Sequence, residues 1–256
     1  MKTDTMSTIN LDFFANRASV RVFSDRPVSE NTVEKIIEAA AHASTTGNMQ
    51  LYSVIVTRNA ENRENLAALH LNQPAATGAP VLLTICADIR RFAQWCAARD
   101  ARSGLDNPGG WLSAITDAAI FGQQIVTAAE SIGLGCCFLG SAAYNIEGFC
   151  DALGLPDGVL PLVGIAMGYP AAEVKPNPDR LPVDAIMHKE RYHDPLPDEI
   201  DRYYAYKEAM PESEVFIKEN HKKTLAQVFS EVRYPASLNE AVGREVMARI
   251  TKKTDV

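Results

Sequence analysis

Two arginines bracket a serine in the sequence RASVR, close to the N-terminus. On an extended backbone, side chains two residues apart point to the same side, so Arg17, Ser19 and Arg21 would face one way. The two valines, Val20 and Val22, would then face the opposite way, towards a core. Two planar guanidinium groups and a hydroxyl on one side suit a phosphate-sized anion. From these residues alone, a solvated turn between two helices remains the competing interpretation.

A second candidate is the small polar stretch from Ser44 to Gln50, which breaks a helical pattern and contains a glycine. Its carboxamides, on Asn48 and Gln50, can both donate and accept hydrogen bonds. That chemistry suits a heterocycle with alternating carbonyl and N–H groups, such as a flavin ring. The competing interpretation is an ordinary turn capped by Asn48.

Two further candidates follow later in the chain. Gly140 and Ser141 come directly after an apolar run, where glycine lets a ligand approach backbone N–H groups closely. Arg180 lies between Pro178 and Pro182, and a stiffened segment holds a charge in place at lower entropic cost. The alternatives are a simple strand-to-helix turn and a surface arginine paired with a neighbouring aspartate.

Several familiar kinds of site are absent from the sequence. No G-x-G-x-x-G follows an expected strand, and neither G-x-x-x-x-G-K-[ST] nor G-x-S-x-G occurs. The five cysteines form no C-x-x-C pair and the five histidines are scattered, so we predict neither a disulfide framework nor a metal site. We therefore name no catalytic residue; if the protein is an enzyme, a cofactor carries the reaction.

The bulk composition narrows the possible partners. A formal charge of −7 argues against binding to nucleic acid or to an anionic membrane. No run of about 18 apolar residues occurs, so no transmembrane helix is expected. The first ten residues lack a signal-peptide pattern, which makes a cytoplasmic location the expectation. With 256 residues that are 46% hydrophobic, the chain can bury a substantial core.

The elements that must position these candidates follow from periodicity and end signals. Helices are expected at 7–16, from a Ser29 cap to about 42, at 60–71, at 111–131 with Gly133 as its stop, and from Asn145 to near Gly154. Strands are expected at 51–57, 80–87, 136–139 and 160–167. Alternating strands and helices suggest a parallel α/β sheet, although residues 88–110 are long enough to let a strand reverse. That segment should be irregular or partly helical and could form a lid.

The composition changes after residue 170. Four prolines between 170 and 182 predict a stiff, extended connector. From about residue 197 the pattern is helical and highly charged, with too few apolar positions for an independent domain. We expect this tail to pack against the body of the protein or against a second copy.

Together these segments resemble the FMN-dependent nitroreductase/flavin reductase superfamily, especially its oxygen-insensitive NADPH nitroreductase branch. The matching segments run collinearly over about residues 8–210. They are RASVR (17–21), the stretch 44–50, the block 117–170 with AAESIGLGCCFLG (128–140), NIEGFCDALGLP (145–156) and VLPLVGIAMGYP (159–170), and DRLPVDAIMHKERY (179–192).

The resemblance implies an α+β fold in place of the parallel sheet. The expected architecture is a three-layer α-β-α sandwich with a mixed, mainly antiparallel central sheet. Residues 8–195 would form the FMN-binding domain. Residues 196–256 would form a helical extension that is not an independent domain and embraces the partner subunit. Members form an intertwined homodimer with FMN sites at the interface.

The resemblance also implies roles for particular residues. Arg17, Ser19 and Arg21 would hold the FMN phosphate and ribityl chain, with Ala18 in the same binding segment, and Arg180 would be a phosphate ligand from a second segment. Three residues would meet the isoalloxazine edge or ribityl chain from the partner subunit: Ser44, Asn48 and Gln50. Three would line the ring near N5, with backbone N–H groups as donors: Leu139, Gly140 and Ser141. Three positions that are often basic in the family carry other residues here: Asn16, Ala18 and Pro178.

The implied activity is an NAD(P)H oxidoreductase that reduces nitroaromatics, quinones or flavins. It would work by ping-pong, two-electron hydride transfer through flavin N5, with a small-molecule acceptor. Alternatives in the same class are a flavin reductase or a reductive dehalogenase relative. An FMN-binding or sensing protein with little turnover is the alternative from another class, and a relative that has lost flavin is more distant.

Overall fold

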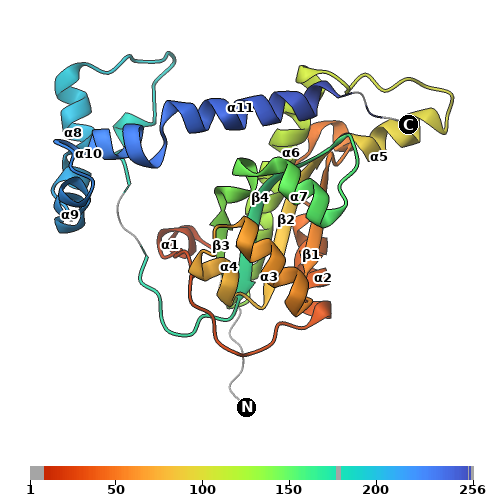
Figure 1. Cartoon of the computed structure of the whole chain (residues 1–256), viewed down its shortest axis with the longest axis horizontal. Helices are drawn as coiled ribbons and strands as arrows, with labels where there is room; N and C mark the ends of the chain where they lie inside the picture. The colour runs from red at the N-terminus through yellow and green to blue at the C-terminus, as the bar shows by residue number, and fades with distance from the viewer. Residues whose placement is uncertain (1–8, 177–179, 253, 255–256) are drawn as a thin grey trace. The chain divides into compact units, whose positions relative to one another are not determined.

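Four apolar segments form one sheet with the order β1-β2-β4-β3 in the computed structural model, which describes residues 9–176, 180–252 and 254 (Figure 1). The strands are β1 (Tyr52–Thr57), β2 (Val81–Asp88), β3 (Gly135–Leu139) and β4 (Val159–Gly168). All three pairings of this sheet are antiparallel. The parallel sheet suggested by the alternation of strands and helices was therefore wrong, because the long connections let the chain return in either direction. The α+β fold implied by the resemblance is confirmed.

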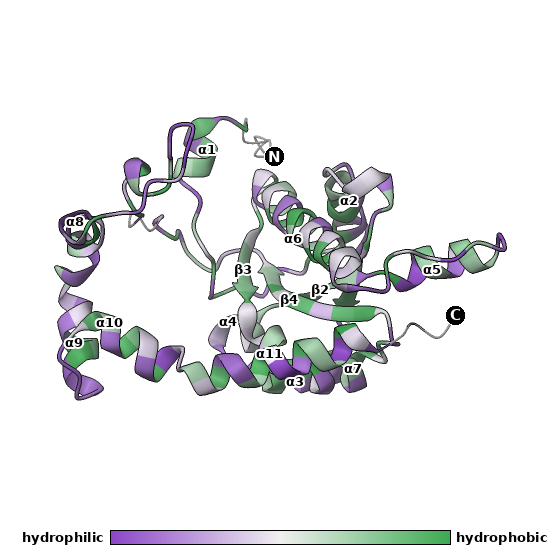
Figure 2. Cartoon of the chain, turned by 90° about the horizontal axis from the view of Figure 1, so that it is seen from above, coloured by the Kyte–Doolittle hydropathy of each residue, from purple (hydrophilic) through white to green (hydrophobic). Residues whose placement is uncertain are grey.

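Side chains of β2 alternate between two apolar layers. Leu83 and Ile85 pack with residues of α6 (Pro108–Ser131) and α2 (Glu30–Ala40). Leu82 packs on the opposite face, with residues of three helices: α3 (Ala60–Leu69), α4 (Pro74–Gly78) and α7 (Ile146–Leu153). Figure 2 shows the sheet between these two sets of helices. The pleat alternates side chains between the faces, and both faces are covered, so the three-layer sandwich is confirmed.

Helix ends follow the local sequence signals closely. Ser29 Oγ accepts the N–H of Thr32 at 3.1 Å and caps α2, as predicted. Gly133, with φ +83°, follows α6 in the left-handed conformation expected for a stop. The predicted start of α6 at residue 111 is three residues late, because Asn107 caps the helix through the N–H groups of Gly109 and Gly110. Within the 88–110 segment, α5 (Arg90–Ala97) confirms the partly helical expectation.

The chain divides into two compact units. Unit 1 reaches Pro176 and resumes at Val242; it holds the sheet, the helices named so far, α1 (Leu11–Ala15) and the 3₁₀ turns η1 (Thr46–Asn48) and η2 (Gly140–Tyr144). Unit 2 is Asn177–Ala241. It contains the 3₁₀ turn η3 (Val183–Ala185), helices α8 (Pro197–Glu208), α9 (Pro211–Glu219) and α10 (Leu225–Gln227), a π-helical turn η4 (Val228–Arg233) and the first residues of α11 (Ala236–Thr251). The helical pattern expected from about residue 197 is confirmed, and the functional division between residues 195 and 196 stays a prediction.

The C-terminal part of α11 belongs to unit 1 and is fixed there by one buried arginine. Arg249 donates to the carbonyl oxygens of Leu155 at 2.9 Å and Pro156 at 2.6 Å. Its Nη1 also lies 3.0 Å from Asp157 Oδ1. Because several partners neutralise and satisfy this guanidinium, it can be buried without an unpaired charge. The end of the tail therefore packs against the body, as expected.

Candidate functional site

The RASVR segment lies along the outer edge of β3. Val20 donates its backbone N–H to the carbonyl of Cys136 at 3.0 Å, and the Val20 side chain is buried. A Cβ on Gly135 would lie only 2.3 Å from Val20 Cγ2, so this close approach requires glycine. The expectation that Val22 also faces the core was wrong, because its side chain is 67% exposed. After Val20 the segment no longer follows β3 as a regular strand, and the strict alternation of faces ends.

The two arginines of this segment have different surroundings. Arg17 is half-buried, and its Nε lies 3.2 Å from Oε2 of Glu130 on α6. Arg21 is exposed, and no ion pair involves it among the residues that the structure describes. Arg17 thus ties the segment to α6, whereas the Arg21 charge stays available for a ligand.

Glu130 is a buried carboxyl that the sequence reading did not single out. Its side chain is 11% exposed, and burial raises its pKa to about 7, an effect that the Arg17 charge opposes. Within the described part of the chain, Glu130 Oε1 and Arg17 Nε are both buried without an aligned hydrogen-bond partner. The pair is therefore an ion contact with unused hydrogen-bonding capacity at the edge of the candidate phosphate site.

Glu130→Gln tests this buried carboxyl through the pH dependence of stability. The folded carboxyl holds its proton up to about pH 7, whereas the unfolded one releases it near pH 4.5. The protonated carboxyl therefore contributes fully to the free energy of unfolding below pH 4.5, and this contribution is lost as the pH rises towards 7. The free energy of unfolding of the native protein should therefore fall relative to Glu130→Gln, by up to about 3 kcal/mol between pH 5 and 8. Urea titrations at fixed protein concentration measure this difference, and parallel pH profiles for the two proteins would contradict it.

The segment Leu139-Gly140-Ser141, called the glycine corner below, lies where β3 ends and η2 begins. Leu139 and Ser141 are buried, whereas Gly140 between them is exposed. No atom lies within 4 Å of a Cβ placed on Gly140, so the space over its backbone is open. The side chains of Leu139 and Ser141 therefore cannot face a ligand in this conformation, and contact would be made through the backbone. Gly140 is four residues from Cys136, about 13 Å along the strand.

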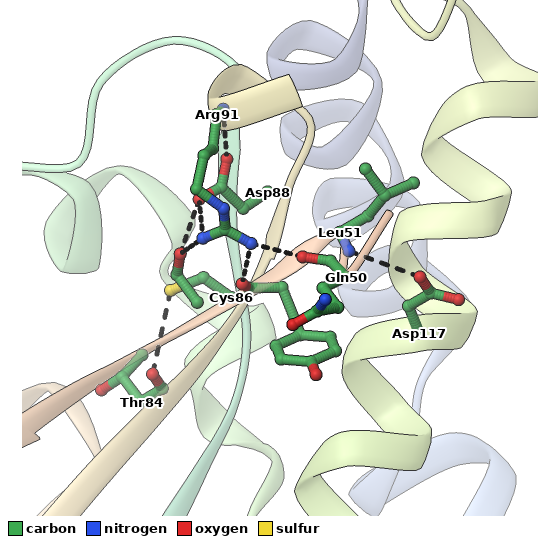
Figure 3. Close-up of polar contacts among 9 residues, drawn as sticks. Gln50, Leu51, Thr84, Cys86, Asp88, Arg91 and Asp117 are labelled. Atoms are coloured by element: carbon green, nitrogen blue, oxygen red, sulfur yellow. Dashed lines mark hydrogen bonds and ion pairs between the residues drawn. The ribbon is translucent and has the colours of Figure 1, made fainter. Parts of the chain in front are cut away.

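Residues 44–50, which carry the amides of Asn48 and Gln50 and are called the amide loop below, are held by a buried aspartate on α6. Asp117, only 1% exposed, accepts the backbone N–H of Thr46 at 2.8 Å and its hydroxyl at 2.9 Å. Its other oxygen lies 3.4 Å from the N–H of Leu51, on the far side of the loop (Figure 3). Asn48 and Gln50 adopt left-handed backbone angles, with φ of +55° and +53°. Such angles are uncommon for residues with a Cβ, so the carboxylate supports a backbone that would otherwise relax.

Arg91 holds the second end of this loop. Its guanidinium donates to the carbonyl oxygens of Gln50 and Tyr52, and it lies 3.5 Å from Asp88 (Figure 3). Ser53 completes the group by donating to Asp88 at 2.5 Å. The exposed amides of Asn48 and Gln50 are thus presented by a loop with a fixed backbone.

RASVR, the candidate phosphate clamp, and the amide loop lie at opposite edges of the sheet. RASVR runs alongside the edge strand β3, and the amide loop comes directly before β1, the other edge strand. Their anchors on α6, Glu130 and Asp117, are 13 residues apart, which is about 20 Å along the helix. Arg17 and Ala18 line one hollow and Gln50 lines another. The structure therefore brings RASVR and Gly140 to one strand but does not bring the amide loop to them.

Arg180 belongs to unit 2, where its side chain is exposed. Its role as a phosphate ligand stays a prediction, and Pro178 lies outside the described residues. The sequence alone did not identify Asp117, Glu130 or Arg91 as residues of the site. For Asp117 a signal existed, because it falls on the buried stripe of α6 with Ala114, Ala118 and Phe121. A charged residue on such a stripe needs polar partners.

The cysteines form no disulfide, and all five are buried. Across the described ranges, no three His, Cys, Asp or Glu side chains are arranged to hold a metal ion. No helix within those ranges is long and apolar enough to cross a bilayer.

Comparison with known proteins gives a consistent result. The model of the nitroreductase family matches residues 14–169. An oxygen-insensitive NADPH nitroreductase from Salmonella typhimurium is 36% identical over 193 residues, which cover 74% of this chain and 77% of the relative. An FMN reductase (NADPH) from Bacillus subtilis is 31% identical over 185 residues, covering 72% and 74%. A solved structure from Bacteroides fragilis superimposes with a TM-score of 0.89 at 43% identity, covering 93% of this chain and 97% of that chain.

Proposed function

The chain belongs to the nitroreductase family of FMN-binding, NAD(P)H-dependent oxidoreductases, and we propose that it passes electrons from NAD(P)H to nitroaromatics, quinones or flavins. The names of the relatives, an NADPH nitroreductase and an FMN reductase, support both ends of this reaction. FMN held between RASVR and the backbone of Gly140 would supply the redox chemistry, namely hydride transfer from NAD(P)H and two-electron transfer to the acceptor in a ping-pong cycle. The protein supplies binding, orientation and electrostatics.

The observation that carries the proposal is the arrangement of polar groups at the two ends of β3. Arg21 and Ser19 lie at one end, and the exposed backbone of Gly140 lies at the other. A guanidinium without an ion-pair partner among the described residues suits a phosphate. The open space over Gly140 lets a planar ring approach its backbone closely. The free charge at one end and the open backbone at the other fit the phosphate end and the ring end of FMN.

We further propose that each site takes its amide loop from a second copy of the chain. Asn48 and Gln50 would reach the ring edge or the ribityl chain of FMN bound to the partner. The two halves lie at opposite edges of the sheet, beside β1 and β3 with two strands between them, which supports this arrangement. The protein would then be a homodimer with two equivalent sites at its interface, because a twofold axis exchanges the contributions of both copies.

Anaerobic stopped-flow mixing of the FMN-loaded protein with NADPH, and separately with NADH, tests the reaction. We expect the flavin absorbance to bleach within seconds and to recover when a nitroaromatic, a quinone or free FMN is added. Mixing with NADP⁺, which carries no hydride, is the control. Flavin that keeps its colour with both reduced nucleotides would instead indicate an FMN-binding or sensing protein. Protein that fails to take up FMN would overturn the proposal.

A further inference from the structure

Three polar side chains meet behind the glycine corner, on the side away from the open space. They come from His70, which caps the end of α3, from Gln73 before α4, and from Ser141 in η2. Ser141 Oγ lies 2.9 Å from His70 Nδ1 and accepts a hydrogen bond from Gln73 Nε2 at 3.0 Å. His70 and Ser141 are 1% and 4% exposed. Buried polar groups such as these two need hydrogen-bond partners, and the three side chains supply them to one another.

The imidazole of His70 has little freedom to move. Its ring centre lies 4.8 Å from that of Phe149 on α7. On the other side it packs against β4, where a Cβ on Gly164 would lie 2.6 Å from His70 Cε1. Gly164 is paired in register with Leu139, the residue before the corner. The ring is therefore fixed between α7 and the sheet, directly under the end of β3.

Burial gives His70 a defined charge. Burial lowers its pKa to about 4, so the ring is neutral near pH 7 and has one donor and one acceptor nitrogen. Because Ser141 Oγ accepts from Gln73, its own hydrogen can be donated to His70 Nδ1. Removing any member leaves a buried donor or acceptor unpaired.

We propose that His70 is a positioning residue for the flavin ring, acting through the Ser141 hydroxyl on the peptide between Gly140 and Ser141. Leu139 and Ser141 are buried and Gly140 between them is exposed, so holding Ser141 would fix the plane of the peptide that joins it to Gly140. A backbone donor fixed in advance beside the bound ring would polarise it for hydride transfer without reorganisation. This inference rests on the proposed function, and it assigns a task to a buried histidine that contacts neither FMN nor NAD(P)H.

The rate of flavin bleaching by NADPH in the FMN-loaded protein tests the inference. Ser141→Ala and His70→Phe should each slow bleaching by about 10-fold at saturating NADPH, because the corner loses its fixed orientation. FMN affinity and the NADPH concentration for half-maximal rate should stay near their native values. His70→Gln, which can still hydrogen-bond to Ser141, should recover most of the rate. The visible absorption maximum of bound FMN should shift in the slow variants and return in His70→Gln.

The control is Thr57→Val, which removes a buried hydroxyl from the opposite edge strand. It should leave both the bleaching rate and the absorption maximum of the bound flavin at their native values. Native bleaching rates and spectra in both Ser141→Ala and His70→Phe, with a lower melting temperature, would show that the cluster only stabilises the fold and would overturn the inference. A failure of the proposed function is distinguishable, since the native protein itself would then not bleach.

Discussion

Arg21→Ala should weaken FMN binding by about 30-fold or more, which corresponds to about 2 kcal/mol. The Arg21 guanidinium is exposed beside β3 and lacks an ion-pair partner among the residues described, so the substitution removes a charge-assisted contact and breaks no internal one. Stability of the protein without FMN should therefore change little. Titration of the flavin-free protein with FMN, followed by quenching of flavin fluorescence, gives the dissociation constant.

Arg99→Ala is the matched control, because it removes an equal charge from an exposed arginine near the end of α5. Its FMN affinity should remain native. Arg17→Ala should differ from both, since losing the partner of Glu130 lowers stability as well as FMN affinity. Unchanged FMN affinity in Arg21→Ala would show that RASVR is not the phosphate clamp.

Asp117→Ala should lower the free energy of unfolding by about 2–4 kcal/mol, because two backbone N–H groups and a hydroxyl lose their buried acceptor. The loop would also lose the support for the left-handed angles of Asn48 and Gln50. FMN affinity should fall along with stability, although Asp117 itself is buried away from any ligand. Urea titration at fixed protein concentration and FMN titration measure the two effects.

Asp117→Asn provides a graded comparison. Its remaining oxygen can still accept from Thr46, while its N–H₂ group would face the N–H of Leu51, so it should lie between the native protein and the alanine variant. Equal stability of the native protein and Asp117→Ala would mean that this carboxylate does not anchor the loop.

Local signals in the sequence predicted most of the elements but not the direction of the strands. Ser29 as a cap and Gly133 as a stop depend on backbone groups a few residues away, so a short window contains the information. The direction of β4, which is antiparallel to both β2 and β3, depends on how the chain returns through α7, and no local pattern records that. The antiparallel sheet was reached only through resemblance to a family.

The contacts of the candidate site also depend on residues far apart in the sequence, which local patterns do not reveal. The RASVR spacing indicated an anion clamp, but it could not show that Arg17 is already occupied by Glu130, a partner 113 residues later in the chain. His70 gave no signal as a single histidine, because its role depends on Ser141, which is 71 residues away. The alternation that placed Val22 in the core failed because pairing of the segment with β3 does not continue past Val20.

The central claim, that FMN is held by two copies of the chain, is tested most directly by complementation between two defective subunits. One subunit carries Arg21→Ala, and the other carries Asn48→Gly with Gln50→Gly, which removes the amides while glycine keeps the left-handed backbone. Co-expression with two different affinity tags allows the heterodimer to be purified from both homodimers.

If the sites are shared, the heterodimer has one site with all three substitutions and one site with none. We predict that it binds one FMN tightly per dimer and has about half of the NADPH-dependent activity of the native dimer, far above either variant homodimer. If each chain instead builds its own site, both sites of the heterodimer carry a defect. Activity no higher than the mean of the two variant homodimers would contradict the shared site.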